Sequence, residues 1–157
     1  MSHFTDRPVR MGAWSSPMYV AAHASWNYDP AFYRSQPRSL QPVRNKPVYK
    51  KPMALLVNGG TFSSAENFCV AFRSAARGPI IGTPTAGSTG NPIQIELGYG
   101  VYASICTKYE WTADGEVFIG EGIVPDIEVE QTADFYEKGG DAVVDRALSE
   151  LNRSRRR

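Results

Sequence analysis

The sequence predicts an α/β fold in which short buried strands alternate with amphipathic helices. The run 53–57 is continuously apolar and stops at Asn58-Gly59-Gly60, as is typical of a strand buried on both faces. A stretch with helical apolar spacing follows, and a second buried strand begins at Ile80-Ile81 after Gly78-Pro79. The chain of 157 residues, with 42% hydrophobic and 21% charged side chains, is sufficient for one globular domain.

Residues 1–52 are expected to form an extended segment, rich in proline and aromatic residues, that packs on the core. Seven of the eleven prolines and two of the three tryptophans lie in this range, and proline disfavours long helices and central strands. The many aromatic side chains argue against a disordered tail. One short helix is predicted here, over 29–35.

Residues 53–152 are expected to form the α/β core, beginning with the strand 53–57. A helix is predicted over 64–77, because its apolar residues recur with helical spacing on one face. Alternation predicts a half-exposed strand over 93–97 and a longer strand over 101–111. The remaining expected elements are a hairpin turn at 113–115, short strands at 117–119 and 127–129, and a last helix capped by Asp141 with Val143, Val144, Ala147, Leu148 and Leu151 on its inner face.

Charge is distributed unevenly along the chain, although the net charge is only +1. Residues 1–52 contain eight Lys or Arg and two Asp, whereas residues 53–152 contain five Lys or Arg and fourteen Asp or Glu. Residues 153–157 form a basic tail with four arginines, which is expected to fray. A basic arm can bind nucleic acid, but it can equally cover the acidic core of the same chain. We favour the second interpretation and expect no nucleic-acid partner.

The sequence contains no sign of a metal site, a membrane span or a secretory signal. Cys69 and Cys106 stand alone and are expected to be small buried residues in a helix and a strand. No apolar run approaches the ~18–20 residues that a membrane-crossing helix needs. The N-terminus lacks the apolar core of a signal peptide. We therefore expect no metal, no cofactor and no membrane span.

The segment 58–66 is the candidate for chemistry, because it places Ser63 between a buried strand and the start of a helix. Amide groups at a helix N-terminus are free to donate, and they carry the positive end of the helix dipole. Such groups can stabilise the oxyanion formed when a serine attacks a carbonyl, and the N–H of Ser64 is the natural first donor.

A purely structural interpretation of the same residues stays open. Ser63-Ser64-Ala65-Glu66 is also a capping box, in which the serine and the glutamate satisfy helix amides reciprocally. The GxSxG signature of α/β-hydrolases is absent, since Ala65 stands two residues after Ser63. The local pattern alone therefore does not separate a nucleophile from a helix cap.

Residues 54–151 resemble the tail-specific, or C-terminal-processing, serine protease family, including its branch with the tricorn core and interphotoreceptor retinoid-binding protein. The landmarks are the strand 54–57, the run Gly60-Thr61-Phe62-Ser63-Ser64-Ala65-Glu66, then Pro84-Thr85-Ala86-Gly87 and Gly122-Ile123-Val124-Pro125-Asp126-Ile127. The resemblance implies a ClpP/crotonase-like layered fold and places the nucleophile at Ser63. It also implies that the chain is the C-terminal part of a larger catalytic core, since the family's upstream half has no counterpart here.

The resemblance leaves the general base open. Ser88 stands where many relatives have a lysine, so a Ser/Lys pair is not expected. The tricorn-like branch uses a histidine with a carboxylate partner, and Glu121 matches the position of that carboxylate. The only histidines, His3 and His23, lie in the N-terminal segment and are interpreted as surface or packing residues. Asp126, Ser88 and Glu121 each have an ordinary explanation as turn or solvated residues.

The sequence therefore predicts a serine endopeptidase that acts through a Ser63 acyl-enzyme on peptides or unfolded proteins, and the isolated chain can be incomplete and inactive. The alternative is a non-catalytic module of the same fold that binds a ligand or a peptide. A homo-oligomer is left open. The family is often found in the bacterial periplasm or cell envelope, but this sequence carries no address.

Overall fold

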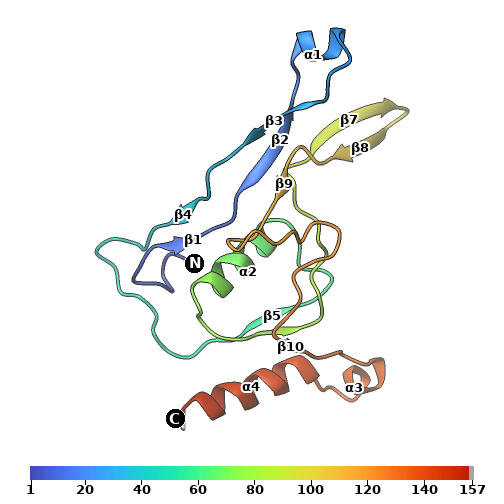
Figure 1. The fold of residues 1–157 in the computed structure, drawn as a ribbon. Helices are drawn as coiled ribbons and strands as arrows, with labels where there is room; N and C mark the ends of the chain where they lie inside the picture. Colours follow the sequence, from blue (N-terminus) through green and yellow to red (C-terminus); the bar gives the residue numbers. More distant parts are fainter. Residues whose placement is uncertain (156–157) are drawn as a thin grey trace.

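The computed structural model describes residues 1–155 and confirms the α/β class (Figure 1). Its elements lie in four small sheets and four helices of the described chain. In chain order they are β1 (Val9–Arg10), β2 (Trp14–Met18), α1 (Ala21–Ser25), β3 (Ala31–Arg34), β4 (Ser39–Leu40), β5 (Leu55–Val57), α2 (Ser64–Ser74), β6 (Ile80–Gly82), β7 (Ile93–Gly98), β8 (Val101–Ile105), β9 (Tyr109–Glu110), β10 (Ile127–Glu128), α3 (Ala133–Glu137) and α4 (Ala142–Arg155).

The centre of the molecule is a parallel sheet with the strand order β10-β6-β5. Leu55 pairs with Ile80, and Ile127 pairs with Ile81. Helix α2 lies on one side of this sheet and α4 on the other (Figure 1). Strand β6 is buried along its length, but Leu56 of β5 is 40% exposed, so the expected burial of β5 on both faces is wrong in part. This layering explains why β5 and β6 consist of continuous apolar runs rather than alternating ones.

The predicted helix after β5 is confirmed as α2, and its inner face supplies three residues of the central core cluster. Phe72 and Ile80 are fully buried, and Cys69, Val57 and Ile123 pack in the same cluster. Each such large apolar side chain contributes roughly 1.5–3 kcal/mol through burial. The helix ends at Ser74, three residues before the predicted end at Arg77, and a turn leads from there to Gly78-Pro79.

Asp126 fixes the third strand to this layer. Its Oδ2 accepts the Ile80 N–H at 2.8 Å, and its own N–H donates to the Ile80 carbonyl at 2.8 Å. The guanidinium of Arg73 donates to the Val124 carbonyl at 2.5 Å and lies 3.4 Å from Asp126. The structural interpretation of Asp126 is therefore confirmed.

An arm built from β2, α1 and β3 projects from the central layer (Figure 1). The expected helix over 29–35 is wrong, because Ala31–Arg34 forms β3 and pairs antiparallel with β2. The adjacent aromatic residues Phe32 and Tyr33 have a high preference for strands, and pairing with β2 decides the conformation. The short helix of this region is α1, at the outer end of the arm.

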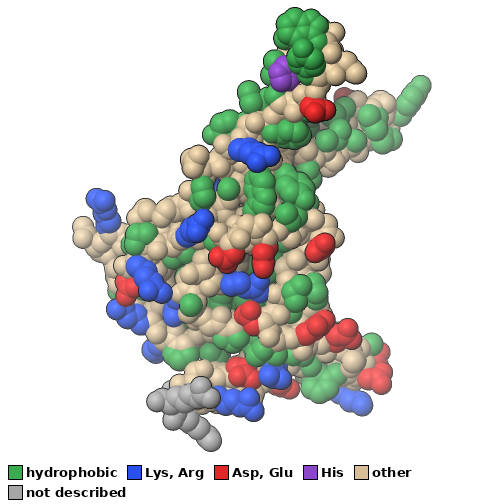
Figure 2. All heavy atoms as spheres, in the orientation of Figure 1, with side chains coloured by type: hydrophobic (Ala, Val, Ile, Leu, Met, Phe, Trp, Pro, Cys, Tyr) green, Lys and Arg blue, Asp and Glu red, His purple; other side chains and the backbone are tan. Residues whose placement is uncertain are grey.

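The hairpin β7–β8 is a second projection, and its apolar side chains are exposed. Ile93, Leu97 and Val101 are each more than half exposed, so the expected half-burial of 93–97 is wrong. The reason is that β7 and β8 pair only with each other within the described chain. Figure 2 shows hydrophobic side chains gathered on this hairpin and on the β2–α1–β3 arm, away from the charged body.

The hairpin is closed where it leaves the body. The Gly90 carbonyl accepts the N–H groups of Thr107 and Lys108 at 2.9 and 3.0 Å, and the Thr107 hydroxyl donates to the Asn91 carbonyl at 2.7 Å. This closure interrupts the strand expected over 101–111, which is split into β8 and β9.

The hairpin turn predicted at 113–115 is confirmed, since Gly115 N–H donates to the Thr112 carbonyl at 3.1 Å. The strand expected over 117–119 is reduced to a single bridge between Trp111 and Val117. The strand expected over 127–129 is confirmed as β10.

Helix α4 begins where it was predicted to begin. Asp141 Oδ1 accepts the N–H groups of Val143 and Val144 at 3.0 and 2.9 Å, which confirms the cap. The predicted inner face is wrong in part, because Ala147 is buried but Val144 and Leu148 are exposed.

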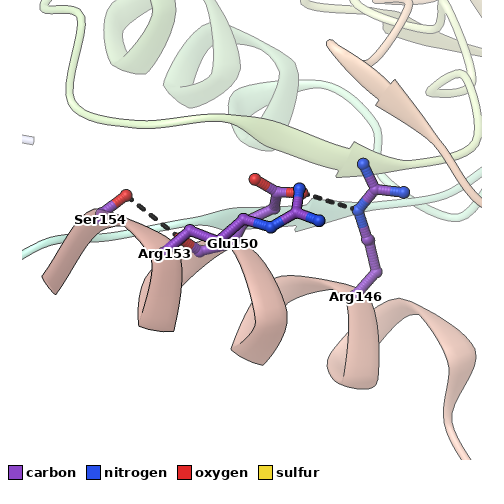
Figure 3. A network of polar contacts seen from close by, with 4 residues as sticks. All are labelled: Arg146, Glu150, Arg153 and Ser154. Carbon is purple, nitrogen blue, oxygen red and sulfur yellow. Dashed lines mark hydrogen bonds and ion pairs between the residues drawn. The ribbon is translucent and has the colours of Figure 1, made fainter. Parts of the chain in front are cut away.

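The last turns of α4 carry a network of polar contacts in which Glu150 bonds Arg146 at 2.9 Å and Arg153 at 3.3 Å (Figure 3). Helical order continues to residue 155, into the tail that was expected to fray. Residues 156–157 of that predicted tail lie outside the described residues. Among residues 1–155, no helix has the length and hydropathy needed to cross a membrane.

The two cysteines differ in accessibility, which gives a testable prediction. Cys69 is buried as expected, but Cys106 is exposed just beyond β8, so its expected burial is wrong. Burial raises the pKa of the Cys69 thiol to about 11, and the negative charge of Glu66 adds to the shift. Since the thiolate is the reactive form, iodoacetamide at pH 8 is expected to alkylate Cys106 in the native chain and Cys69 only after unfolding.

Intact-mass measurements with and without denaturant check this prediction. A single adduct on the native chain and two on the unfolded chain are expected. Equal rates at both cysteines in the native chain would contradict it.

Candidate active site

The turn between β5 and α2 is tight and internally bonded. The Thr61 N–H donates to the Asn58 carbonyl at 2.8 Å, and the Gly60 N–H donates to the Asn58 side chain at 2.9 Å. The Asn58 N–H donates in turn to the Thr61 hydroxyl at 3.2 Å. These bonds fix the backbone that delivers Ser63 to the first turn of the helix.

Ser63 itself has an unfavourable backbone conformation, with φ 56° and ψ −122°. A residue with a β-carbon rarely adopts this combination, which lies outside the ordinary left-handed helical region. Holding it costs on the order of 1–3 kcal/mol, and such strain is concentrated at functional sites. A strained turn from strand to helix is also the geometry by which hydrolytic enzymes present a nucleophilic serine.

The hydrogen bonds around Ser63 bind its backbone rather than its hydroxyl. Its N–H donates both to the Ser88 carbonyl at 2.9 Å and to the Glu66 carboxylate at 3.1 Å. The predicted capping box is confirmed: the Ser63 side chain faces the Glu66 N–H, which also donates to the Ser63 carbonyl at 2.9 Å, while the Glu66 carboxylate accepts the Ser63 N–H. The Ser63 hydroxyl is half-buried and donates no hydrogen bond within residues 1–155, so its proton is not engaged there.

The Ser64 N–H is the expected oxyanion donor, and no acceptor takes it within the described part of the chain. The neighbouring amides of Ala65 and Asn67 are taken by the carbonyls of Phe62 and Ser63. A free amide in the first turn of an eleven-residue helix also lies at the positive end of its dipole. The arrangement can therefore stabilise a negative charge that develops beside Ser63.

Glu66 is fully buried and reaches beyond the helix that it caps. Its Oε1 accepts the Thr85 hydroxyl at 2.6 Å and the Gly87 N–H at 2.7 Å, while its Oε2 accepts the Ser63 N–H at 3.1 Å. The sequence analysis took Glu66 only as a helix cap. The signal that it missed is the spacing, since Glu66 precedes the buried residues Cys69 and Val70 by three and four positions and so lies on the apolar face.

A third loop, 118–126, closes on the other two. The Thr85 hydroxyl accepts the Ile123 N–H at 2.7 Å, and the Gly120 N–H donates to the Gly87 carbonyl at 2.8 Å. The fit is so close that a β-carbon on Gly87 would lie 2.6 Å from the Gly122 nitrogen. The loops that carry Ser63, Ser88 and Glu121 are thus held against one another.

The structure brings some of the candidate residues together and leaves others apart. The Ser88 carbonyl touches the Ser63 turn, and the Glu121 backbone lies in the loop packed on Gly87. His23 lies instead on α1, at the outer end of the arm, with Nδ1 3.1 Å from the Asp29 carbonyl oxygen (Figure 1). His3 is exposed, and its carbonyl accepts the N–H of Tyr49.

A cavity of about 300 Å³ opens beside the Ser63 turn. Asn58 and Thr61 line it from the turn, Val57 from β5, and Tyr136 and Val143 from α3 and α4. Its position at the carboxyl ends of parallel strands is where open α/β sheets commonly bind ligands. Among residues 1–155, no three His, Cys, Asp or Glu side chains come together to hold a metal ion.

A strained turn from strand to helix that carries a serine is a geometry found in hydrolytic enzymes, and comparison with known sequences identifies the family. The profile of Peptidase family S41 matches residues 15–129, and the chain belongs to this family. A carboxy-terminal-processing protease of Bartonella bacilliformis is 35% identical over 95 residues, which cover 60% of this chain and 22% of that protein. The resemblance to C-terminal-processing proteases is thereby confirmed.

Solved structures agree with the fold. A Parabacteroides merdae protein described as a peptidase matches 96% of this chain and 45% of its own, with a TM-score of 0.77 and 21% identity. Mature CPAF matches 96% of this chain and 38% of its own, with a TM-score of 0.68 and 18% identity. This chain therefore spans less than half the length of each of these relatives, and its fold corresponds to part of an S41 catalytic core.

Proposed function

We propose that this chain carries the nucleophile-bearing part of a serine endopeptidase site, in which Ser63 forms an acyl-enzyme with a peptide substrate. The observation that carries the proposal is the strained Ser63 turn, with φ 56° and a half-buried hydroxyl that donates no hydrogen bond within residues 1–155, in a chain of peptidase family S41. Strain is retained at a helix cap only where the surrounding structure enforces it, and a cap alone gives no reason to do so.

The chemistry follows from the groups at the turn. The Ser63 Oγ attacks the carbonyl carbon of the substrate, its proton passes to a base, and the Ser64 N–H receives the resulting oxyanion. Collapse of the tetrahedral intermediate returns the proton to the leaving amine and releases it. Water then attacks the acyl-enzyme with the same base, which restores the Ser63 hydroxyl and releases the carboxylic acid product.

We propose that the general base is an imidazole, and that neither histidine of residues 1–155 supplies it. No hydrogen bond within residues 1–155 joins either histidine to the Ser63 turn, and His23 lies on α1, at the outer end of the arm. Glu121, whose loop is packed on the Ser63 turn through Gly87, is the proposed carboxylate that orients this imidazole.

Chemical rescue tests the proposal on the chain as it stands. A fluorophosphonate probe is expected to label the chain slowly, and added imidazole should accelerate labelling at Ser63 because it replaces the missing base. Intact mass should show one adduct, and peptide mapping should place it on Ser63.

Ser64→Ala is the matched control for this experiment, since it removes a neighbouring hydroxyl but keeps the backbone N–H that we assign to the oxyanion. It should label as the unmodified chain does. A labelling rate that does not depend on imidazole, or an adduct on another residue, would refute the assignment of Ser63 as the nucleophile.

A further inference from the structure

We infer that Glu66 is a positioning residue, whose buried carboxylate holds the Ser63 amide and the loop 85–88 in one fixed arrangement. The inference rests on the proposed role of Ser63 as the nucleophile. It assigns to Glu66 a task that helix capping does not include, which is to join the nucleophile turn to the loops on which the rest of the site depends.

The burial of Glu66 is the first step of the argument. A capping glutamate needs only one bond, to the amide of the cap residue, and can otherwise stay in water. Glu66 is 0% exposed, although burying a carboxylate is costly unless hydrogen bonds satisfy it. Its burial is therefore explained by the three donors that surround it, and two of these lie outside the helix.

The identity of the three donors is the second step. Ser63 and Gly87 each donate a backbone N–H and Thr85 donates its hydroxyl, at distances between 2.6 and 3.1 Å. Hydrogen bonds to a carboxylate are among the strongest in proteins. The Glu66 side chain thus ties the strained residue directly to the loop whose Ser88 carbonyl accepts from the same Ser63 N–H.

The onward connection of Thr85 is the third step. Thr85 is 5% exposed, and its hydroxyl donates to Glu66 while accepting the Ile123 N–H at 2.7 Å. Glu66 therefore reaches the loop of Glu121 through a single intermediate. One carboxylate sets the relative placement of the proposed nucleophile and the proposed orienting residue.

Glu66→Gln separates this role from capping and packing, because glutamine keeps the size of the side chain but replaces one acceptor oxygen with a donor. An amide nitrogen against the Ser63 N–H, or against Thr85 and Gly87, breaks part of the network in either orientation. Amide hydrogen exchange at Ser63 and Gly87 is expected to rise by about ten- to a hundredfold, while exchange in α4 stays unchanged. The maximal rate of imidazole-assisted labelling should fall by at least about tenfold, with little change in the half-saturating probe concentration.

Two further comparisons sharpen the test. Glu96→Gln, on the exposed strand β7, makes the same chemical change without a buried network and should leave exchange and labelling unaltered. Thr85→Val should raise exchange at Ile123 while the direct Glu66 bond keeps Ser63 protected. Thr85→Ser, which restores a hydroxyl, should restore Ile123 protection.

The outcomes separate this inference from the proposed function. Increased exchange confined to the three loops supports positioning, whereas an equal increase in α4, or unchanged exchange and labelling, overturns it. If the unmodified chain never labels at Ser63, the proposed function fails, while the exchange pattern of Glu66→Gln still decides whether Glu66 holds the turn.

Discussion

Ser63→Ala and Ser63→Gly are both expected to abolish imidazole-assisted labelling, but the glycine variant should be the more stable of the two by about 1–2 kcal/mol. Neither side chain offers a nucleophile, so the loss of reactivity should be complete in both. The difference in stability arises because alanine keeps a β-carbon in the strained conformation at φ 56°, whereas glycine adopts it without that cost.

Glycine is already preferred over alanine at an ordinary helix N-cap, and the strained φ of Ser63 is expected to add to that preference. Urea unfolding of the two variants gives the free energies of unfolding, and the slopes of the transitions should agree if both unfold from the same fold. Residual Ser63-independent labelling would show that another residue carries the reactivity. An alanine variant at least as stable as the glycine variant would show that the turn stores no strain.

Gly122→Ala is expected to destabilise the chain by about 2–5 kcal/mol and to disrupt the site. Gly122 has φ 84°, and a β-carbon there would overlap the Thr85 carbonyl oxygen. The added methyl must push the 118–126 loop away from Thr85, whose hydroxyl links Glu66 to Ile123. Labelling at Ser63 should therefore fall together with stability.

Gly120→Ala is the matched control, because Gly120 has nearly the same φ, 86°, but nothing within 4 Å of an added β-carbon. The Gly120→Ala variant should lose only about 1–2 kcal/mol of stability, which is the cost of placing a β-carbon at a positive φ. The difference between the two variants in urea unfolding isolates the steric contribution of the close approach. Equal free energies of unfolding would mean that the loops are not packed as tightly as the structure shows.

The parts of the fold that could be predicted from sequence are those decided by neighbouring residues. The apolar run of β5, the helix that follows it and the Asp141 cap all follow from patterns within a few positions. The helix predicted over 29–35 was wrong because pairing with a partner strand, rather than local preference, determines the conformation of this segment. The predictions that Cys106 is buried and that β7 is half-buried were wrong, because alternation shows that a strand has two different faces but not whether another element covers either face.

The candidate site divides in the same way. The position of Ser63 between strand and helix follows from the local sequence, and the resemblance to a protease family directs attention to it. Its positive φ and the reach of Glu66 to Thr85 and Gly87 depend on contacts about twenty residues away in sequence, which spacing cannot reveal. The assignments of Ser63, Ser64 and Glu121, and the division of the chain at residue 52, remain predictions.

The closed base of the β7–β8 hairpin has a consequence for how this protein can evolve. The Gly90 carbonyl accepts the N–H groups of Thr107 and Lys108, so the two ends of the segment 91–106 are held close together. The entropy lost in closing such a loop grows only slowly with its length. Insertions and deletions in the β7–β8 hairpin are therefore expected to leave the geometry of the loops around Ser63 unchanged. We expect related chains to differ in length at this hairpin.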